Sequence, residues 1–192
     1  MKHANIRRMA GLALLMATIV VLQSIPIPPV AGFPISLVLI PIVLGGALFG
    51  PGAGALLGAV FGGIVYLNCV TGVDAGGAMV FQANPVLCFI VVMLKGIVAG
   101  WASALVYQAL KGKNARLAML CAAIVCPVLN TGIFIAFMMT CFTEVLSLWA
   151  GGGEIVAYVL SGLLVANFVP ELLINVVFSP AGQQIVGIVQ KK

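Results

Sequence analysis

Long apolar stretches separated by short polar breaks dominate this sequence. A membrane-crossing helix needs about 20 mainly apolar residues, and six stretches are candidates. We expect spans at about residues 9–25, 35–49, 53–70, 86–110, 117–142 and 155–178. The stretch at 35–49 is short and contains Pro41, so a kinked or partly re-entrant segment is the alternative there. The pattern predicts an all-α fold, a six-transmembrane-helix bundle that forms a single integral membrane domain over residues 1–192.

Polar and helix-breaking residues define the ends of these stretches. Pro26, Pro28 and Pro29 end the first, because proline donates no backbone hydrogen bond and restricts the residue before it. The uncharged loop at residues 23–34 is apolar enough to act as a lid or to lie in the membrane interface. The start of the chain also resembles a signal peptide, whose removal would leave five spans.

Composition supports a membrane protein. Apolar residues make up 63% of the chain, charged residues 7%, and the mean hydropathy is +1.26, whereas soluble domains are about 25% charged. Such a chain has too little charge for the surface of a soluble enzyme and is too apolar for a disordered protein.

The few charges are distributed unevenly along the chain. We place the N-terminus in the cytoplasm and let the chain cross the membrane six times. Eight cations then fall on the cytoplasmic side: Lys2, Arg7, Arg8, Lys111, Lys113, Arg116, Lys191 and Lys192. The outer side receives Asp74, Glu144 and Glu154 and no Lys or Arg. This bias follows the positive-inside rule and predicts that both termini are cytoplasmic. The net charge of +5 therefore reflects inner-leaflet anchoring rather than nucleic-acid binding.

Sequence motifs for catalysis are missing. The chain has no GxxxxGK[ST], HExxH or GxSxG motif. Its five cysteines form no CxxC pair and it has one histidine, so no catalytic residue, metal site or cofactor is expected. A disulfide between Cys69 and Cys88 is conceivable, but buried apolar filler is the preferred interpretation of these thiols. We expect a protein that is not an enzyme.

Three polar residues from different spans lie at similar expected depth. Counting from the outer helix ends, Lys95 lies roughly 14 Å deep and Asn130 and Asn167 roughly 18 Å deep. Facing inward, they would form the floor of an outward-facing cavity for a solute with a carboxylate or several hydrogen-bonding groups. We expect Asn84, Gln82 and Tyr66 at its entrance, which completes the predicted substrate-binding set.

Structural roles are the alternative for these polar residues. Lys95 could form an internal ion pair with Glu171, although Glu171 is expected roughly 24 Å deep, some 10 Å below it. Asn130 and Asn167 could tie helices together. These alternatives stay open at the level of sequence.

Small residues recur at four-residue spacing. Gly54, Gly58 and Gly62 in one span, and Gly96 and Gly100 in the next, predict close helix packing within the bundle. Ala13 and Ala17 form a similar face on the first span, which could equally dock another protein.

Several stretches, taken together and in this order, resemble one known family, the substrate-binding S components of energy-coupling factor (ECF) vitamin transporters. The matching stretches are residues 8–17, 39–54, 94–100, 127–132 and 167–175. One departure is the turn at residues 50–52, Gly-Pro-Gly, where relatives often carry a basic residue.

The resemblance implies a binding subunit of a bacterial plasma-membrane importer. Such a subunit captures a vitamin-like small molecule and docks, through Ala13 and Ala17 here, onto a transmembrane coupling subunit that carries two ATPase subunits. The sequence looks like the general branch that binds riboflavin, pantothenate or folate. Lys95 favours an anionic solute such as pantothenate over riboflavin, and the scarcity of tryptophan leaves little for stacking a flavin.

Two other functions remain as alternatives. One is a self-sufficient secondary carrier or channel that uses Lys95 and Glu171 as a gating pair. The other is a structural membrane protein whose polar residues only hold helices together.

Overall fold

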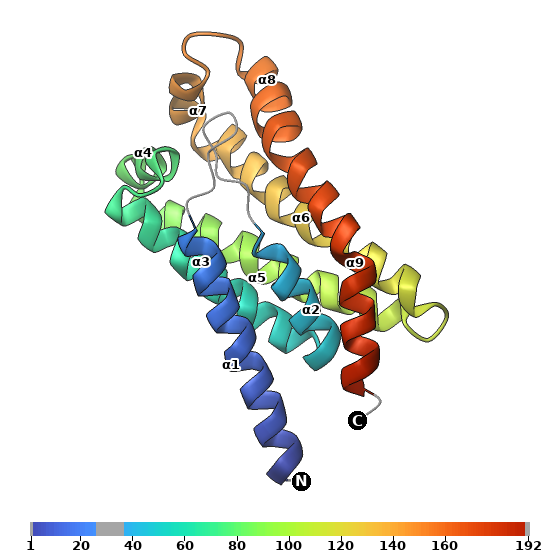
Figure 1. The fold of residues 1–192 in the computed structure, drawn as a ribbon. Helices are drawn as coiled ribbons and strands as arrows, with labels where there is room; N and C mark the ends of the chain where they lie inside the picture. Colours follow the sequence, from blue (N-terminus) through green and yellow to red (C-terminus); the bar gives the residue numbers. More distant parts are fainter. Residues whose placement is uncertain (1, 26–36, 191–192) are drawn as a thin grey trace.

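The computed structural model of the protein describes residues 2–25 and 37–190, which are helical almost throughout (Figure 1). The elements are α1 (Lys2–Ser24), α2 (Leu39–Phe49), α3 (Pro51–Thr71), α4 (Ala75–Ala83), α5 (Pro85–Leu110), α6 (Ala115–Cys141), α7 (Thr143–Trp149), α8 (Ile155–Tyr158), a π-helical segment η1 (Val159–Phe168) and α9 (Val169–Gln190). No strand occurs in the described ranges, which confirms the predicted all-α class.

Within residues 2–25 and 37–190, five helical segments are long and apolar enough to cross a membrane, namely Ile6–Ser24, Pro51–Thr71, Pro85–Leu110, Ala115–Cys141 and Ile155–Val189. They agree with five of the six predicted spans to within a few residues, except that the last continues well beyond residue 178. The remaining predicted span, at 35–49, begins outside the described residues. Most of the loop at 23–34 also lies outside them.

Helix α2 is short but deeply buried. Its 11 residues rise roughly 16 Å, about half of a hydrocarbon core about 30 Å thick. Val38, Leu39 and Ile42 are fully shielded, and the helix packs against α3, α5, α6 and α9. The six-span count, the single-domain organisation and the cytoplasmic location of the termini stay predictions. The beginning of α1 and the end of α9 do lie at one end of the bundle, opposite α4, α7 and α8 (Figure 1).

Polar side chains cap the helices at the loops. The Gly77 amide donates to Asp74 Oδ1 at 3.0 Å at the start of α4, and the Leu87 amide donates to Asn84 Oδ1 at 3.0 Å at the start of α5. These caps satisfy backbone donors that a helix leaves without partners at its first turn. They fix where α4 begins, after residue 74, and where α5 begins, after residue 84.

Glycines bring α3 and α5 into backbone contact. A Cβ atom added to Gly58 would overlap the carbonyl oxygen of Gly96, and one added to Gly54 would overlap that of Gly100. Small residues permit such close approach where lipid gives no hydrophobic reward for association. The predicted packing role of these glycines inside the bundle is therefore confirmed.

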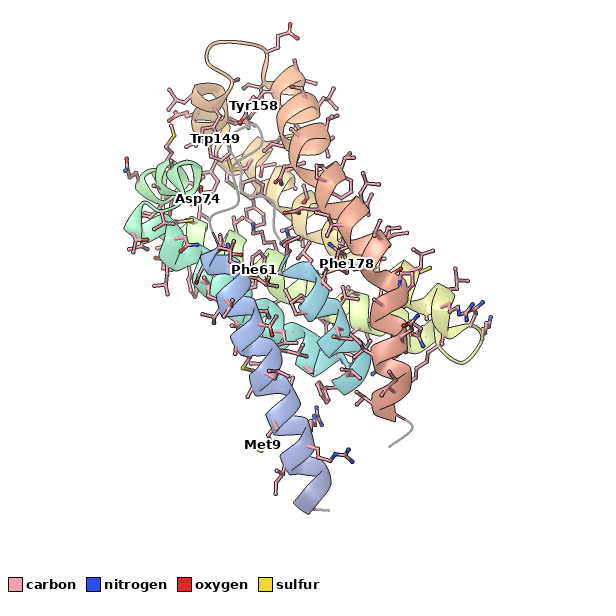
Figure 2. All side chains as sticks on the ribbon, viewed as in Figure 1. Met9, Phe61, Asp74, Trp149, Tyr158 and Phe178 are labelled. Atoms are coloured by element: carbon pink, nitrogen blue, oxygen red, sulfur yellow. The ribbon has the colours of Figure 1, made fainter. Side chains whose placement is uncertain are left out.

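Helix α1 lies at the edge of the bundle and buries little of its surface. Ile19 is fully buried, yet only 6% of the residues in the 18-residue apolar stretch of this helix are buried. Met9 is 70% exposed and points away from the other helices (Figure 2). Ala13 and Ala17, the predicted docking residues, are both exposed.

Candidate solute-binding cavity

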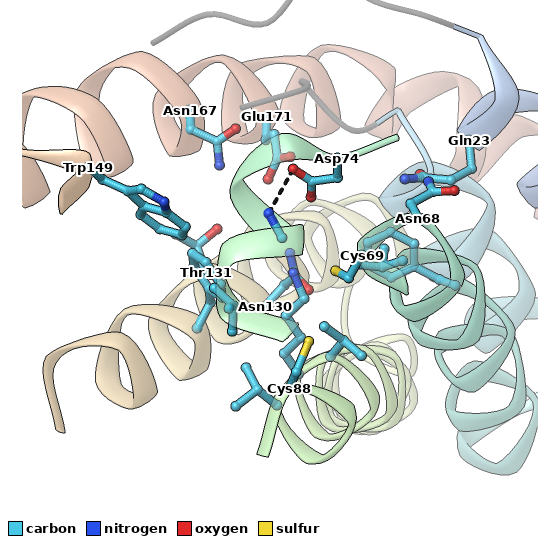
Figure 3. Close-up of a pocket in the computed structure, with 18 residues that line it drawn as sticks. Gln23, Asn68, Cys69, Asp74, Cys88, Asn130, Thr131, Trp149, Asn167 and Glu171 are labelled. Carbon is cyan, nitrogen blue, oxygen red and sulfur yellow. Dashed lines mark hydrogen bonds between the residues drawn. The ribbon is translucent and has the colours of Figure 1, made fainter. Parts of the chain in front are cut away.

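A cavity opens among α3, α5, α6 and the η1–α9 segment, on the side of the bundle where α4 and α7 lie (Figure 3). It holds about 870 Å³ of space between atoms, part of it continuous with the exterior. The lining includes polar residues from several helices and from the turn before α4: Gln23, Asn68, Asp74, Lys95, Asn130, Thr131, Asn167 and Glu171. Among the other lining residues are Phe61, Cys69, Cys88, Phe134 and Trp149.

Lys95 is the cation of this lining. Its ammonium nitrogen lies 4.9 Å from the centroid of the Phe134 ring and 5.8 Å from that of Phe61. The face of an aromatic ring carries partial negative charge and attracts a cation, most strongly where water is scarce. The two rings therefore hold the Lys95 side chain within the cavity.

Two carboxyl groups share the cavity with Lys95. Glu171 on α9 is 3% exposed, and Asp74 belongs to the turn before α4. Figure 3 shows their carboxyl groups directed toward the same part of the cavity. From sequence Asp74 was assigned only to an outer loop, and its capping of α4 is what brings it into the wall.

The position of Glu171 relative to Lys95 was predicted from helix rise alone. Counting residues placed Glu171 well below Lys95, but both line one cavity. Helices α5 and α9 are inclined to one another (Figure 1), so equal residue counts do not correspond to equal depth. Asn167 and Glu171 are four residues apart and therefore lie on one face of their helix.

Asn130 and Asn167 contribute amide groups from two different helical segments, α6 and η1. Asn130 is 5% exposed and lies three residues after Pro127, within α6. Asn167 lies in the π-helical segment, a geometry that is frequent at functional sites. The Oδ1 atoms of both are shielded from solvent and have no hydrogen-bond partner among the described residues. Buried polar atoms almost always have partners, so these two oxygens indicate a site for a donor from a ligand or water.

Aromatic side chains form one wall of the cavity. The rings of Phe134 and Trp149 are stacked, with centroids 6.4 Å apart and an angle of 27° between their planes. From sequence, the two tryptophans of the chain were expected to leave little for stacking, and neither was assigned to the site. The position of Trp149 at the end of α7, a helix the sequence analysis did not predict, brings it to the cavity.

The three residues expected at the entrance are not among the residues that line the cavity. Asn84 caps α5, and Gln82 is exposed on α4. Tyr66 makes edge-on contacts with Phe81 and Phe89, at centroid distances of 5.8 Å and 5.1 Å. None of the three is part of the lining, whereas Lys95, Asn130 and Asn167 are brought together as predicted.

The thiols of Cys69 and Cys88 are both buried, free and part of the lining. Among the described residues they form no disulfide. No cluster of three or more metal-ligating His, Cys, Asp or Glu side chains occurs in the same ranges. The described lining provides one cation, two carboxyl groups, amides and aromatic faces. Such a combination is typical of a binding site for a small organic molecule.

The fold and this cavity define a multi-pass helical membrane protein with an internal polar binding site. The family model for the substrate-specific component of ECF transporters matches residues 7–181, nearly the whole chain, and the protein belongs to this family. None of the curated proteins matches the sequence. The family assignment makes the protein a substrate-binding membrane subunit of an ECF importer rather than an enzyme, and implies association with an ECF module and a small-molecule substrate.

Proposed function

We propose that this protein captures a vitamin-like small molecule from outside the cell in the cavity around Lys95, Asn130 and Asn167. The observation that carries the proposal is the pair of shielded amide oxygens without partners, on two residues that line the same cavity as the cation Lys95. Leaving such groups unpaired costs about 1–3 kcal/mol each, which a solute with matching donors would recover on binding.

The charge of the lining constrains the solute. Lys95 favours a carboxylate or another strong acceptor, while Asp74 and Glu171 accept hydrogen bonds and disfavour a bare anion. A pantothenate-like solute matches both the Lys95 cation and the two carboxyl groups, because it carries a carboxylate together with hydroxyl and amide donors. Riboflavin, with a planar ring, is the competitor that the stacked Phe134–Trp149 pair favours. We keep pantothenate ahead of riboflavin because of Lys95.

Delivery of the solute requires the other subunits of the importer. We propose that the exposed face of α1 at Ala13 and Ala17 docks onto a transmembrane coupling subunit, which carries two ATPase subunits. In this proposal the protein is one membrane domain of six spans in a bacterial plasma membrane, with both termini cytoplasmic. The bound solute is released inward by the energy of ATP hydrolysis in those ATPase subunits.

The test is solute binding by the purified full-length protein. Mass spectrometry of the co-purifying small molecule, followed by calorimetric titration with pantothenate, riboflavin and folate, should find one ligand with a submicromolar dissociation constant. Lys95→Ala should weaken that binding at least tenfold. Lys113→Ala, which removes an exposed cation in the α5–α6 loop, should leave it unchanged. Binding of no compound in a vitamin panel would refute the proposal.

A secondary carrier is the second candidate, because Lys95 and Glu171 line one cavity. A carrier that needs no ATPase would accumulate solute in liposomes that contain this protein alone and an ion gradient. The ECF proposal expects no uphill uptake under those conditions.

A further inference from the structure

A second hollow lies far from the solute cavity, between α1, the end of α2 and the end of α9. It holds about 1230 Å³ of space, part of it open to the surroundings. Its walls are mainly apolar and include Leu14, Leu15, Leu44, Leu48, Ile185 and Val189. It lies toward the end of the bundle where α1 begins and α9 ends (Figure 1), so it forms an apolar groove at that end of the membrane-spanning helices.

Two arginines stand on the rim of this groove. Arg7 and Arg8 are exposed and belong to its lining. Arg8 Nη2 donates a hydrogen bond of 3.3 Å to the carbonyl oxygen of Phe49, the last residue of α2. This contact holds one guanidinium next to the groove and leaves its other N–H groups available.

In the part of the chain that the structure describes, no acidic side chain lies beside these cations in the groove. The acidic residues of the whole chain are Asp74, Glu144, Glu154 and Glu171, and none of them lines the groove. Guanidinium groups prefer phosphate and carboxylate partners, which they bind with paired hydrogen bonds. The groove therefore offers an anion site at its rim directly beside a surface for hydrocarbon.

We propose that this groove binds one anionic phospholipid, with its phosphate on Arg7 and Arg8 and an acyl chain along the leucines of α1 and α2. The groove is continuous with a strongly exposed apolar surface, since Leu14 is 69% and Val189 is 49% exposed. In a membrane that surface faces lipid, and clusters of cations at the ends of spans attract anionic headgroups. The lipid site is independent of which solute the other cavity binds.

The experiment compares lipid retention by native mass spectrometry. The full-length protein is released from nanodiscs that contain equal amounts of phosphatidylglycerol and phosphatidylcholine. The wild type should retain one phosphatidylglycerol molecule in clear preference to phosphatidylcholine. Each interfacial cation contributes roughly fivefold to binding of an anionic headgroup, so the double variant Arg7→Gln/Arg8→Gln should lose the preference, with retention lowered roughly 25-fold.

A matched control removes two exposed cations elsewhere. Lys113→Gln/Arg116→Gln lowers the net charge equally in the α5–α6 loop and should leave lipid retention unchanged. If both double variants lose phosphatidylglycerol equally, only net charge matters and the proposal is wrong. Equal retention of the two lipids by the wild type would also overturn it.

The acyl chain has a separate test that spares the arginines. Val189→Trp should fill the groove and lower phosphatidylglycerol retention severalfold, whereas Val177→Trp, at a 70% exposed position of α9 outside the groove, should not. Glycerol phosphate in millimolar excess should not displace the lipid, because it lacks the chains. Displacement by glycerol phosphate would show that the site recognises only the phosphate and that the acyl chain contributes nothing, which would overturn the proposed lipid site. Unchanged lipid retention in Arg7→Gln/Arg8→Gln with loss of assembly with the coupling subunit would make the groove a protein interface instead.

Discussion

The ammonium nitrogen of Lys95 lies 4.9 Å from the centroid of the Phe134 ring, and this ring also stacks against Trp149. The cation that defines the cavity is thus positioned by an aromatic wall. A cation–π contact contributes about 2 kcal/mol or more when desolvated. Lys95 and Phe134 should therefore be energetically coupled.

A double-mutant cycle measures this coupling. Phe134→Leu and Lys95→Met, separately and together, should give a coupling free energy of about 1–2 kcal/mol in the free energy of unfolding, because each substitution alone removes the same contact. Unfolding of the purified protein in detergent, without solute, provides the measurement. Phe89→Leu combined with Lys95→Met is the control, since Phe89 contacts Tyr66 outside the cavity lining. Additive free energies for the Phe134 pair would show that the ring does not hold the cation.

The glycine contact between α3 and α5 makes a second prediction. Gly58→Ala would place a methyl group against the Gly96 carbonyl, and backbone cannot move aside as a flexible side chain can. We expect a loss of about 1–3 kcal/mol or more in the free energy of unfolding, seen as a lower melting temperature in detergent. Gly63→Ala on the same helix, where an added Cβ has no neighbour within 4 Å, should be neutral. Similar melting temperatures for the two variants would contradict the close packing of α3 on α5.

The sequence predicted the helices and much of the cavity for separate physical reasons. Long apolar stretches and proline or glycine breaks determine where helices form, so five spans agreed with the structure to within a few residues at most ends. Lys95, Asn130 and Asn167 were expected together because polar groups are costly in lipid and must face inward. Their clustering in one lining agrees with that reasoning, while contact with solute stays a prediction.

The parts that sequence did not predict depend on how segments tilt and turn. Asp74 and Trp149 reach the cavity through the short helices α4 and α7, which no apolar stretch indicates. Glu171 lines the same cavity as Lys95, and residue counting ignores the inclination of α5 to α9. Asn84 was expected at the entrance, but its side chain is used as the cap of α5, and this role could have been read from its position before Pro85.

Asp74 combines a structural and a charged role that substitutions can separate. Asp74→Asn keeps an oxygen for the Gly77 amide, whereas Asp74→Ala removes the cap, at a cost of about 1 kcal/mol. Hydrogen exchange of the amides of α4 should therefore accelerate in Asp74→Ala only. If the carboxylate also accepts a hydrogen bond from the solute, affinity should fall severalfold in both variants.

A cap variant away from the cavity controls for this experiment. Asn114→Ala removes the acceptor of the Arg116 and Leu117 amides at the start of α6. It should accelerate exchange at that helix end without altering solute affinity. Full solute affinity in Asp74→Asn would mean that the Asp74 charge has no part in binding.

The exposed face of α1 makes the last prediction, which separates capture of the solute from its delivery. Ala13 is exposed on a helix that buries little of its surface, so we expect a larger side chain there to spare the fold and to block close approach of a coupling helix. Ala13→Trp should abolish uptake in cells that contain the complete importer, while the purified variant binds solute as the wild type does. Ala136→Trp, at an exposed alanine of α6, should preserve both. Loss of binding together with uptake in Ala13→Trp would show that this residue supports the cavity rather than an interface, and normal uptake would place the docking surface on another helix.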